Sequence, residues 1–304
     1  MTNISTDTSG VSSTGQPFRS WTIGDLRVTE VVELASTSAI HFIIPEATAD
    51  NLLTIPWAQP HYVNEEGRAR MTIRALIIEN GDTKILVDTC LGNDKERSVP
   101  VWSMRSGPFL EDLAAAGFPP DSIDYVLCTH LHVDHVGWNT RLVDGEFVPT
   151  FPNARYLFGE IEWAHWSASE DSDDVVLMGD SVRPIFDAGL VDLVATDHVL
   201  MPEVTLEPTP GHTPGHVSVR LRSAGAEAVI TGDLSHHPCQ LAHPDWSSSA
   251  DVDRVQSEAT RRAFFADNAD RDVLVLGTHW EPCANRLFVD DADALTYRPE
   301  PFTG

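Results

Sequence analysis

Residues 128–137 read CTHLHVDHVG and follow directly on a mostly apolar run at 123–127. Side chains alternate along an extended chain, so His130 and His132 point to the same side of the strand end. A turn after the strand then brings Asp134 and His135 round to the same point. Imidazole and carboxylate groups are ligands that suit Zn²⁺ or a similar cation. Because this spacing is rarely assembled by chance, the stretch predicts a metal site rather than a polar turn with solvated histidines.

The composition is that of an acidic globular chain. It has 304 residues, of which 42% are hydrophobic, and this is enough for a sizeable core. Its 46 acidic and 20 basic residues give a formal net charge of −26, and no cluster of Lys or Arg occurs. Such a surface repels phosphate backbones and anionic lipid headgroups. We therefore expect neither a nucleic-acid partner nor a membrane partner.

The N-terminal segment and the cysteines bear on the compartment. Residues 1–17 are mostly Ser, Thr and Gly, with one Asn, and lack the apolar stretch of a secretory signal, so they predict a disordered tail before a single domain at 18–304. No apolar run is long enough for a transmembrane helix. The four cysteines are widely spread and form no CxxC pair, which indicates neither a disulfide framework nor a thiolate zinc site. A cytoplasmic location is the expectation.

Short apolar strands alternate with Gly, Pro and Asp turns and with helical segments, which predicts an α/β layered domain. We expect strands at 26–34, 71–78, 84–88, 123–129, 154–158, 204–208, 217–222, 228–231, 273–277 and 287–289. We expect helices at 108–116, 160–167 and 251–268, and the last has apolar Val252, Val255, Ala259 and Ala263 at helical spacing. The stretch 36–70 has no clean periodicity and is either a lid over a site or a surface excursion that packs its own aromatic residues.

The motif THLHVDHVG at 129–137 resembles the signature of the metallo-β-lactamase superfamily, whose fold is a four-layer αββα sandwich. That family places three further ligands downstream, at the ends of strands. This chain has His212 in TPGHTPGH (209–216), Asp233 in TGDL (231–234) and His279 in LGTH (276–279). The resemblance therefore runs from residue 71 to residue 279 and includes the whole ligand set.

The resemblance implies two divalent metal ions, with zinc expected first and manganese, iron or cobalt as alternatives. One ion would take His130, His132 and His212, the other would take Asp134, His135 and His279, and Asp233 would bridge them. Two cations about 3.5–4 Å apart can share a hydroxide that acts as the nucleophile at neutral pH. Asp134 has a second, catalytic role in this scheme, in which it accepts a hydrogen bond from the hydroxide and passes a proton to the leaving group.

Three more residues have both a functional and a structural interpretation. Asp88 resembles the family's strand-end aspartate that supports a ligand imidazole, or it ends a strand in a turn. Trp138 replaces the family's usual glycine, and its ring either contacts an apolar substrate or packs in the core. His236 stands where the lactonases of the family carry a tyrosine near the substrate carbonyl. It would be a catalytic, substrate-binding donor to the oxyanion or the leaving group, or it would point into solvent.

Within the superfamily, TPGHTPGH, Asp233 and the stretch HPDW at 243–246 look most like the N-acyl homoserine lactonase and methyl parathion hydrolase branch. The resemblance implies an enzyme, a dinuclear metal-dependent hydrolase that cleaves a small lactone or ester, or an aryl phosphotriester. It also implies a homodimer. The alternative is an iron-dependent redox protein or a non-catalytic ligand-binding member of the same fold. The complete ligand set favours the hydrolase.

Overall fold

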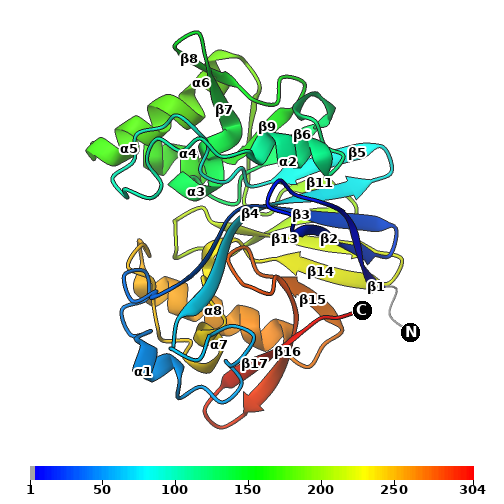
Figure 1. The fold of residues 1–304 in the computed structure, drawn as a ribbon, viewed down its shortest axis with the longest axis vertical. Helices are drawn as coiled ribbons and strands as arrows, with labels where there is room; N and C mark the ends of the chain where they lie inside the picture. The colour runs from blue at the N-terminus through cyan, green and yellow to red at the C-terminus, as the bar shows by residue number, and fades with distance from the viewer. Residues whose placement is uncertain (1–3) are drawn as a thin grey trace. The chain divides into compact units, whose positions relative to one another are not determined.

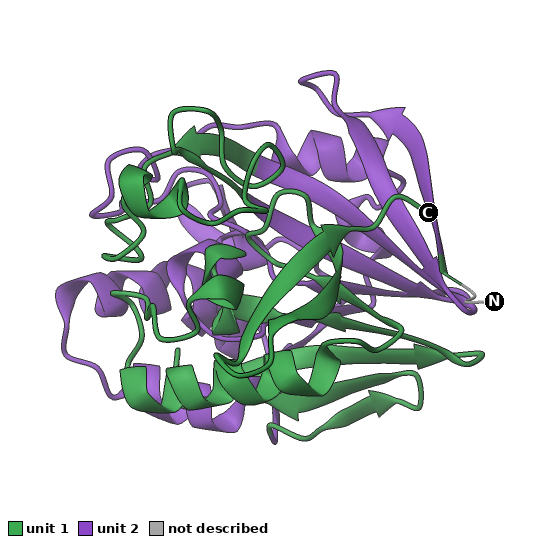
Figure 2. Cartoon of the chain, turned by 90° about the horizontal axis from the view of Figure 1, so that it is seen from below, with its two compact units in different colours: residues 1–4, 34–72, 196–304 green, residues 5–33, 73–195 purple. Residues whose placement is uncertain are grey.

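The computed structural model describes residues 4–304, which divide into two compact units (Figure 2). Unit 1 contains Ile4, Leu34–Thr72 and Thr196–Gly304, and unit 2 contains Ser5–Glu33 and Ile73–Ala195. Each unit therefore collects stretches that are separated in the sequence. The single domain expected at 18–304 stays a prediction. Among the described residues, no helix is long and apolar enough to cross a membrane.

Unit 2 is organised around an eight-stranded sheet with the order β1-β2-β3-β4-β5-β6-β9-β10 (Figure 1). Unit 2 contains all or most of each strand of this sheet, and β1, β3 and β4 also include residues of the unit 1 ranges: β1 (Ile4–Val11), β2 (Pro17–Ile23), β3 (Leu26–Ser38), β4 (Ala69–Asn80), β5 (Thr83–Val87), β6 (Tyr125–Leu127), β9 (Arg155–Gly159) and β10 (Val191–Val194). Its helices are α2 (Phe109–Ala115), α3 (Val133–Val136), α4 (Glu160–Ser167), α5 (Ser172–Leu177) and α6 (Arg183–Asp187). The strands β7 (Thr140–Val143) and β8 (Glu146–Pro149) form a separate hairpin.

The parallel half of this sheet sets the place of the histidine loop. Strand β6 pairs in parallel with β5 and with β9. The carboxyl ends of neighbouring parallel strands meet at the same sheet edge, where polar loops can converge. Asp88 follows β5 directly, and residues 128–137 follow β6, so the two segments lie side by side.

Unit 1 contains a seven-stranded sheet with the order β11-β12-β13-β14-β15-β16-β17. Its strands are β11 (Val199–Met201), β12 (Val204–Pro208), β13 (Val217–Ser223), β14 (Ala226–Ile230), β15 (Val273–Leu276), β16 (Ala284–Asp291) and β17 (Thr296–Pro301). Its helices are α1 (Ala49–Leu52), α7 (Cys239–Ala242) and α8 (Arg254–Asn268). Phe264 and Phe265 of α8 belong to one buried cluster with Val229 of β14 and Val275 of β15, so α8 covers this sheet.

The strand directions bring three loops of unit 1 to one edge. Strands β14 and β15 are parallel, with Ile230 opposite Leu276. Strand β13 runs antiparallel to β14, with Val219 opposite Ile230, so the start of β13 lies beside the end of β14. The loops at 209–216, 231–236 and 277–283 therefore meet at this edge, and each carries one predicted ligand.

The stretch 36–70 is packed rather than extended over the surface. Apolar residues along it, among them Ile44, Leu52 and Tyr62, form a buried cluster with Cys239 and Trp246, all within unit 1. This agrees with the interpretation in which the segment packs its own aromatic residues. The segment contains one short helix, α1, and burial of this apolar surface holds the rest of it in place.

The predicted disordered tail at 1–17 is wrong for the described part of that range, and residues 1–3 lie outside the described residues. Residues Ile4–Val11 form β1 at the edge of the sheet, beside β2. All but Ile4 of these residues are exposed. An edge strand is stabilised by its backbone ladder and can keep polar side chains in water, so the lack of apolar residues did not exclude a strand.

Candidate functional site

The histidine loop of unit 2 gathers the first four predicted ligands. His130 and His135 are buried, and His132 and Asp134 are half-buried. The ring centroid of His130 lies 4.7 Å from that of His132 and 4.1 Å from that of His135. Nε2 of His135 lies 3.7 Å from Oδ1 of Asp134. The structure thus brings together the four residues that the sequence motif predicted.

The glycine that ends the motif has a packing cause. A Cβ on Gly137 would lie 1.8 Å from the carbonyl oxygen of Leu91. The backbone N–H of Gly137 also donates to the carbonyl of Cys90 at 2.8 Å. Only glycine allows this close approach of two backbones, and the approach fixes the loop against the segment that follows β5.

Asp88 contacts both the backbone and one imidazole of the histidine loop. Its Oδ1 accepts a hydrogen bond from the backbone N–H of Thr129 at 2.8 Å, and its Oδ2 lies 2.9 Å from Nδ1 of His135. A carboxylate only accepts, so Nδ1 of His135 carries the proton, and Nε2 carries the lone pair that a metal ligand needs. Asp88 is 1% exposed, and it therefore orients both the loop backbone and one imidazole.

The surroundings of Trp138 favour a packing role. The indole is buried and stacks on Phe109 with ring centroids 5.8 Å apart. Its N–H donates to Oε1 of Glu33 at 2.8 Å, and Oε2 of Glu33 accepts from the backbone N–H of Leu91. Burial raises the pKa of Glu33 even though these hydrogen bonds act to lower it. The substrate-binding role of Trp138 stays a prediction.

Two residues beside the histidine loop were missed from the sequence. Trp166 of α4 packs edge-on against His132, with ring centroids 5.1 Å apart. Its indole N–H donates to Oε2 of Glu162 at 2.7 Å, and the same oxygen accepts from the backbone N–H of Leu131 at 3.2 Å. The buried Glu162 therefore links α4 to the loop. A helical Glu-x-x-x-Trp spacing is too common to have shown this.

Unit 1 holds the other three predicted ligands, and two of them, His212 and His279, lie around the carboxylate of the third, Asp233. Nε2 of His279 lies 3.0 Å from Oδ1, and Nε2 of His212 lies 3.6 Å from Oδ2. Nε2 of His236 lies 3.3 Å from Oδ2. All four side chains are buried. Three imidazole nitrogens directed at one carboxylate form a donor set that fits a divalent transition metal.

Each predicted ligand histidine in this group is held through Nδ1. Nδ1 of His212 lies 2.9 Å from Oδ1 of Asp251, and Nδ1 of His279 lies 2.8 Å from the carbonyl oxygen of Thr72. Both partners only accept, so Nδ1 is the protonated nitrogen and Nε2 faces Asp233 with its lone pair. Asp251 was interpreted as the start of a helix in the sequence, and its contact with His212 was missed because the two are far apart in the chain.

His236 lies in the group and does not point into solvent. It is 5% exposed, its ring stacks parallel to that of His279 at 5.9 Å, and its centroid lies 4.9 Å from that of His212. Within residues 4–304, no hydrogen-bond partner reaches its buried Nδ1. Its ring is thus placed beside the ligand group, but without the Nδ1 anchor that holds His212 and His279.

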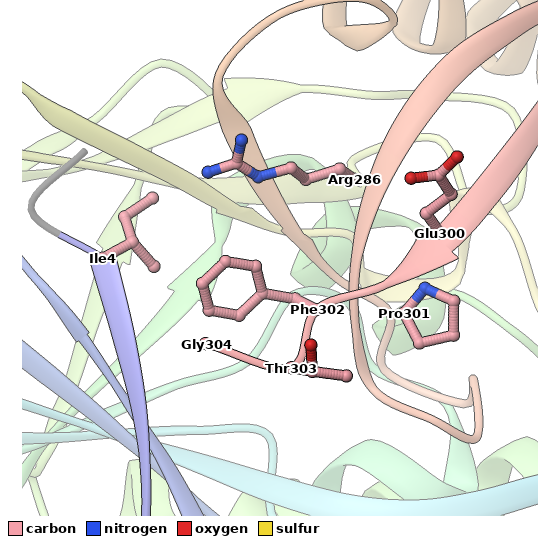
Figure 3. A pocket seen from close by; sticks show the side chains of 7 residues that line it. All are labelled: Ile4, Arg286, Glu300, Pro301, Phe302, Thr303 and Gly304. Atoms are coloured by element: carbon pink, nitrogen blue, oxygen red, sulfur yellow. The ribbon is translucent and has the colours of Figure 1, made fainter. Parts of the chain in front are cut away.

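A separate pocket of about 340 Å³ lies in unit 1 (Figure 3). Its lining includes Arg286, Glu300 and Phe302, and the guanidinium of Arg286 lies over the ring of Phe302 at 5.5 Å. Among the described residues that line it there is no predicted site residue. The pocket is therefore not part of the ligand groups.

Known proteins similar to this chain are lactonases and hydrolases. An N-acyl homoserine lactonase from Bacillus sp. is 24% identical over 176 residues, which cover 53% of this chain and 62% of that relative. The lactonase AttM from Rhizobium radiobacter is 29% identical over 177 residues, covering 54% of this chain and 62% of that relative. The chain thus spans less than two thirds of the length of these relatives.

Solved structures show the same fold. AidC, a dizinc quorum-quenching lactonase, superposes with a TM-score of 0.75 at 21% identity, covering 94% of this chain and 98% of AidC. The hydrolase AbOPH superposes with a TM-score of 0.75 at 22% identity, covering 97% and 98% of the two chains. The metallo-β-lactamase superfamily model matches residues 71–279, which is more than half of the chain and includes every predicted ligand. The chain therefore has the metallo-β-lactamase fold and belongs to that superfamily.

Proposed function

We propose that the chain is a metal-dependent hydrolase that opens a small lactone or cleaves a related carboxylic ester. The observation that carries the proposal is the complete set of seven donors within the family-matched residues: His130, His132, Asp134, His135, His212, Asp233 and His279. The fold and packing alone do not require so many buried ionisable groups, because burying them costs free energy unless they have partners or a ligand. A role in metal binding and catalysis explains these donor groups better than a role in the stability of the fold.

The donor set indicates what the group would hold. Imidazole nitrogens and carboxylates without a thiolate suit two divalent ions, and zinc is the first proposal, ahead of manganese, iron and cobalt. When bound, these ions would polarise the substrate carbonyl and activate water, so the chain itself needs no Ser or Cys nucleophile. The four cysteines agree with this, since all are buried. Burial raises the pKa of Cys90 and Cys128 and so disfavours their reactive thiolate forms.

Proton transfer and stabilisation of the negative oxygen would be carried out by two side chains of the protein. Asp134 is half-buried and beside the ligand histidines, so it can accept a proton and pass it to the leaving oxygen. His236 is buried next to Asp233 and can donate a hydrogen bond to the oxygen that becomes negative in the transition state. These are the catalytic roles that we propose for Asp134 and His236.

The substrate class follows the relatives. The curated proteins similar to this chain are N-acyl homoserine lactonases, so a lactone is the first substrate to test. An aryl phosphotriester is a second candidate of the same branch. We further propose that the substrate is a small molecule, that neither nucleic acid nor membrane is a partner, and that the chain forms a homodimer. A cytoplasmic location also stays a prediction.

The test combines metal content with a hydrolysis panel. Protein purified without added metal would be analysed for zinc, iron, manganese and cobalt. It would be assayed with an acyl homoserine lactone, a simple γ-lactone, an aryl ester and an aryl phosphotriester. Two zinc ions per chain with turnover of the lactones are expected. A single iron, no hydrolysis and consumption of oxygen would overturn the proposal in favour of the redox alternative. Sedimentation would test the dimer.

A further inference from the structure

Asp251 lies in a turn between α7 and α8 that contains no predicted site residue. Its side chain is fully buried, and the two oxygens have different donors. Oδ1 accepts from Nδ1 of His212 at 2.9 Å, and Oδ2 accepts from the backbone N–H of Ser248 at 3.0 Å. A carboxylate can accept on both oxygens at once. An amide in its place would turn its NH₂ group towards one of the two donors, His212 or Ser248.

The backbone around Asp251 is joined to the backbone around His212. The N–H of Val252 donates to the carbonyl of His212, and the N–H of Asp253 donates to the carbonyl of Gly211, each at 3.0 Å. Gly211 has a φ of 129°, and a Cβ there would lie 2.2 Å from the backbone nitrogen of Ser257. The loop that carries His212 is therefore docked on the turn and on the start of α8.

The turn is also held from its other side. The backbone N–H of Ser249 donates to the carbonyl of Ile43 at 2.7 Å, and its hydroxyl donates to the carbonyl of Phe42 at 2.9 Å. Nε2 of Gln240 donates to the carbonyl of Trp246 at 2.7 Å. These bonds fix the turn against the packed 36–70 segment and against α7. The carboxylate of Asp251 is thus presented to His212 by a rigid frame.

We propose that Asp251 is a positioning residue that holds His212 in the Nδ1-protonated tautomer and directs its Nε2 towards Asp233. It acts through His212 and does not itself contact substrate. The physical basis is that of an outer partner of a metal-ligating imidazole, which fixes the tautomer and the ring orientation and raises the basicity of the ligand. The tautomer part stands on the hydrogen bonds alone, and the effect on metal affinity rests on the proposed function.

Asp251→Asn is the primary variant, and Asp245→Asn is its matched control. Asp245 lies in the same segment between α7 and α8 and is exposed. Its Asn variant therefore removes the same charge without changing a contact of His212. The first readout is the tautomer of His212 in metal-free protein, read from the imidazole ¹⁵N shifts at a pH where the ring is neutral. The second is zinc affinity, measured by competition with a chromophoric chelator.

The inference expects an Nδ1-protonated His212 in the wild-type chain and in Asp245→Asn. In Asp251→Asn it expects a mixed or reversed tautomer and a zinc affinity lower by roughly 10- to 100-fold. An Nε2-protonated His212 in the wild-type protein would overturn it, and this measurement needs no variant to fold. Unchanged tautomer and affinity in a folded Asp251→Asn would overturn it too. If the wild-type chain bound none of zinc, manganese, iron and cobalt, the proposed function would fail, whereas the tautomer result would still decide the role of Asp251.

Discussion

Nε2 of His216 accepts a hydrogen bond from the backbone N–H of Asp233 at 2.8 Å. Nδ1 of the same ring lies 3.0 Å from the carbonyl oxygen of Thr209, so it is the protonated nitrogen. The two histidines of TPGHTPGH thus have different structural roles although their local sequences are the same. His212 directs Nε2 at the carboxylate of Asp233, and His216 uses Nε2 to hold the backbone that carries this carboxylate.

The first prediction concerns this backbone contact. Replacing His216 with Ala leaves the buried N–H of Asp233 without its acceptor, so the free energy of unfolding of the metal-free protein should fall by about 1–3 kcal/mol. Urea unfolding measures the change. His216→Gln should recover part of the loss, because its amide oxygen can accept the same N–H. Equal stability of His216→Ala and the wild-type protein would show that the contact contributes nothing.

The second prediction concerns two ligands of the histidine loop. His132→Ala and Asp134→Ala should abolish turnover and lower the metal content, while the far-ultraviolet circular dichroism stays close to that of the wild type. Both side chains are half-buried, His132 in the loop after β6 and Asp134 in the short helix α3, so their loss removes proposed ligands rather than core packing. Metal analysis and lactone hydrolysis check this. Wild-type rates in either variant would remove that residue from the proposed centre.

The third prediction separates a catalytic His236 from a ligand His236. His236→Phe keeps the flat ring but removes both nitrogens. If His236 donates to the reacting oxygen, kcat should fall by about 100- to 10,000-fold with the metal content unchanged. Because Nε2 of His236 lies 3.3 Å from Asp233, a role as a ligand would instead lower the metal content. Parallel metal analysis and steady-state kinetics distinguish the two results.

The fourth prediction concerns Trp138. Trp138→Gly removes the buried ring that stacks on Phe109 and the N–H that donates to Glu33. The free energy of unfolding should therefore fall by about 3–5 kcal/mol. Denaturant unfolding measures this loss. The substrate-binding role expects something different, which is a change in KM that differs among the substrates of the panel. A stable variant with altered preference would favour that role over packing.

Local features of the sequence account for what could be predicted. Strand β12 and helix α4 have the bounds that periodicity indicated, because their patterns are set by neighbours in the chain. The grouping of His130, His132, Asp134 and His135 could be predicted because one short motif holds all four residues. In contrast, helix α8 begins at Arg254, with Asp253 as its N-cap, and not at 251.

Tertiary contacts explain what the sequence did not show. In α8, Val255 of the expected apolar face is 81% exposed, whereas Arg261 is fully buried. Arg261 is buried because its guanidinium donates to the carbonyls of Leu234 and Pro244, which belong to distant segments. Asp251 likewise lies outside α8, and its carboxylate accepts a hydrogen bond from Nδ1 of His212. Such pairings depend on the folded chain, and periodicity in a single sequence does not contain them.

The last prediction is a dependence of stability on pH that is due to His237. This ring is fully buried between two segments of unit 1: its Nε2 lies 3.2 Å from the carbonyl oxygen of Tyr62, and its Nδ1 accepts from the backbone N–H of Cys239 at 3.1 Å. Protonation of Nδ1 would destroy the second bond. Burial lowers the pKa of His237 to about 4, although the bond to Tyr62 acts to raise it.

The folded pKa therefore lies below the unfolded value of about 6.5. Between these values the unfolded chain binds more protons, so stability rises with pH and is lost as pH falls from about 6.5 towards 4. A shift of this size corresponds to about 3 kcal/mol. Urea unfolding of metal-free His237→Gln should show a smaller loss between these pH values than the wild-type protein. The exposed His41 provides the control, since His41→Gln should keep the wild-type pH dependence. The same slope in all three proteins would assign the loss to other groups.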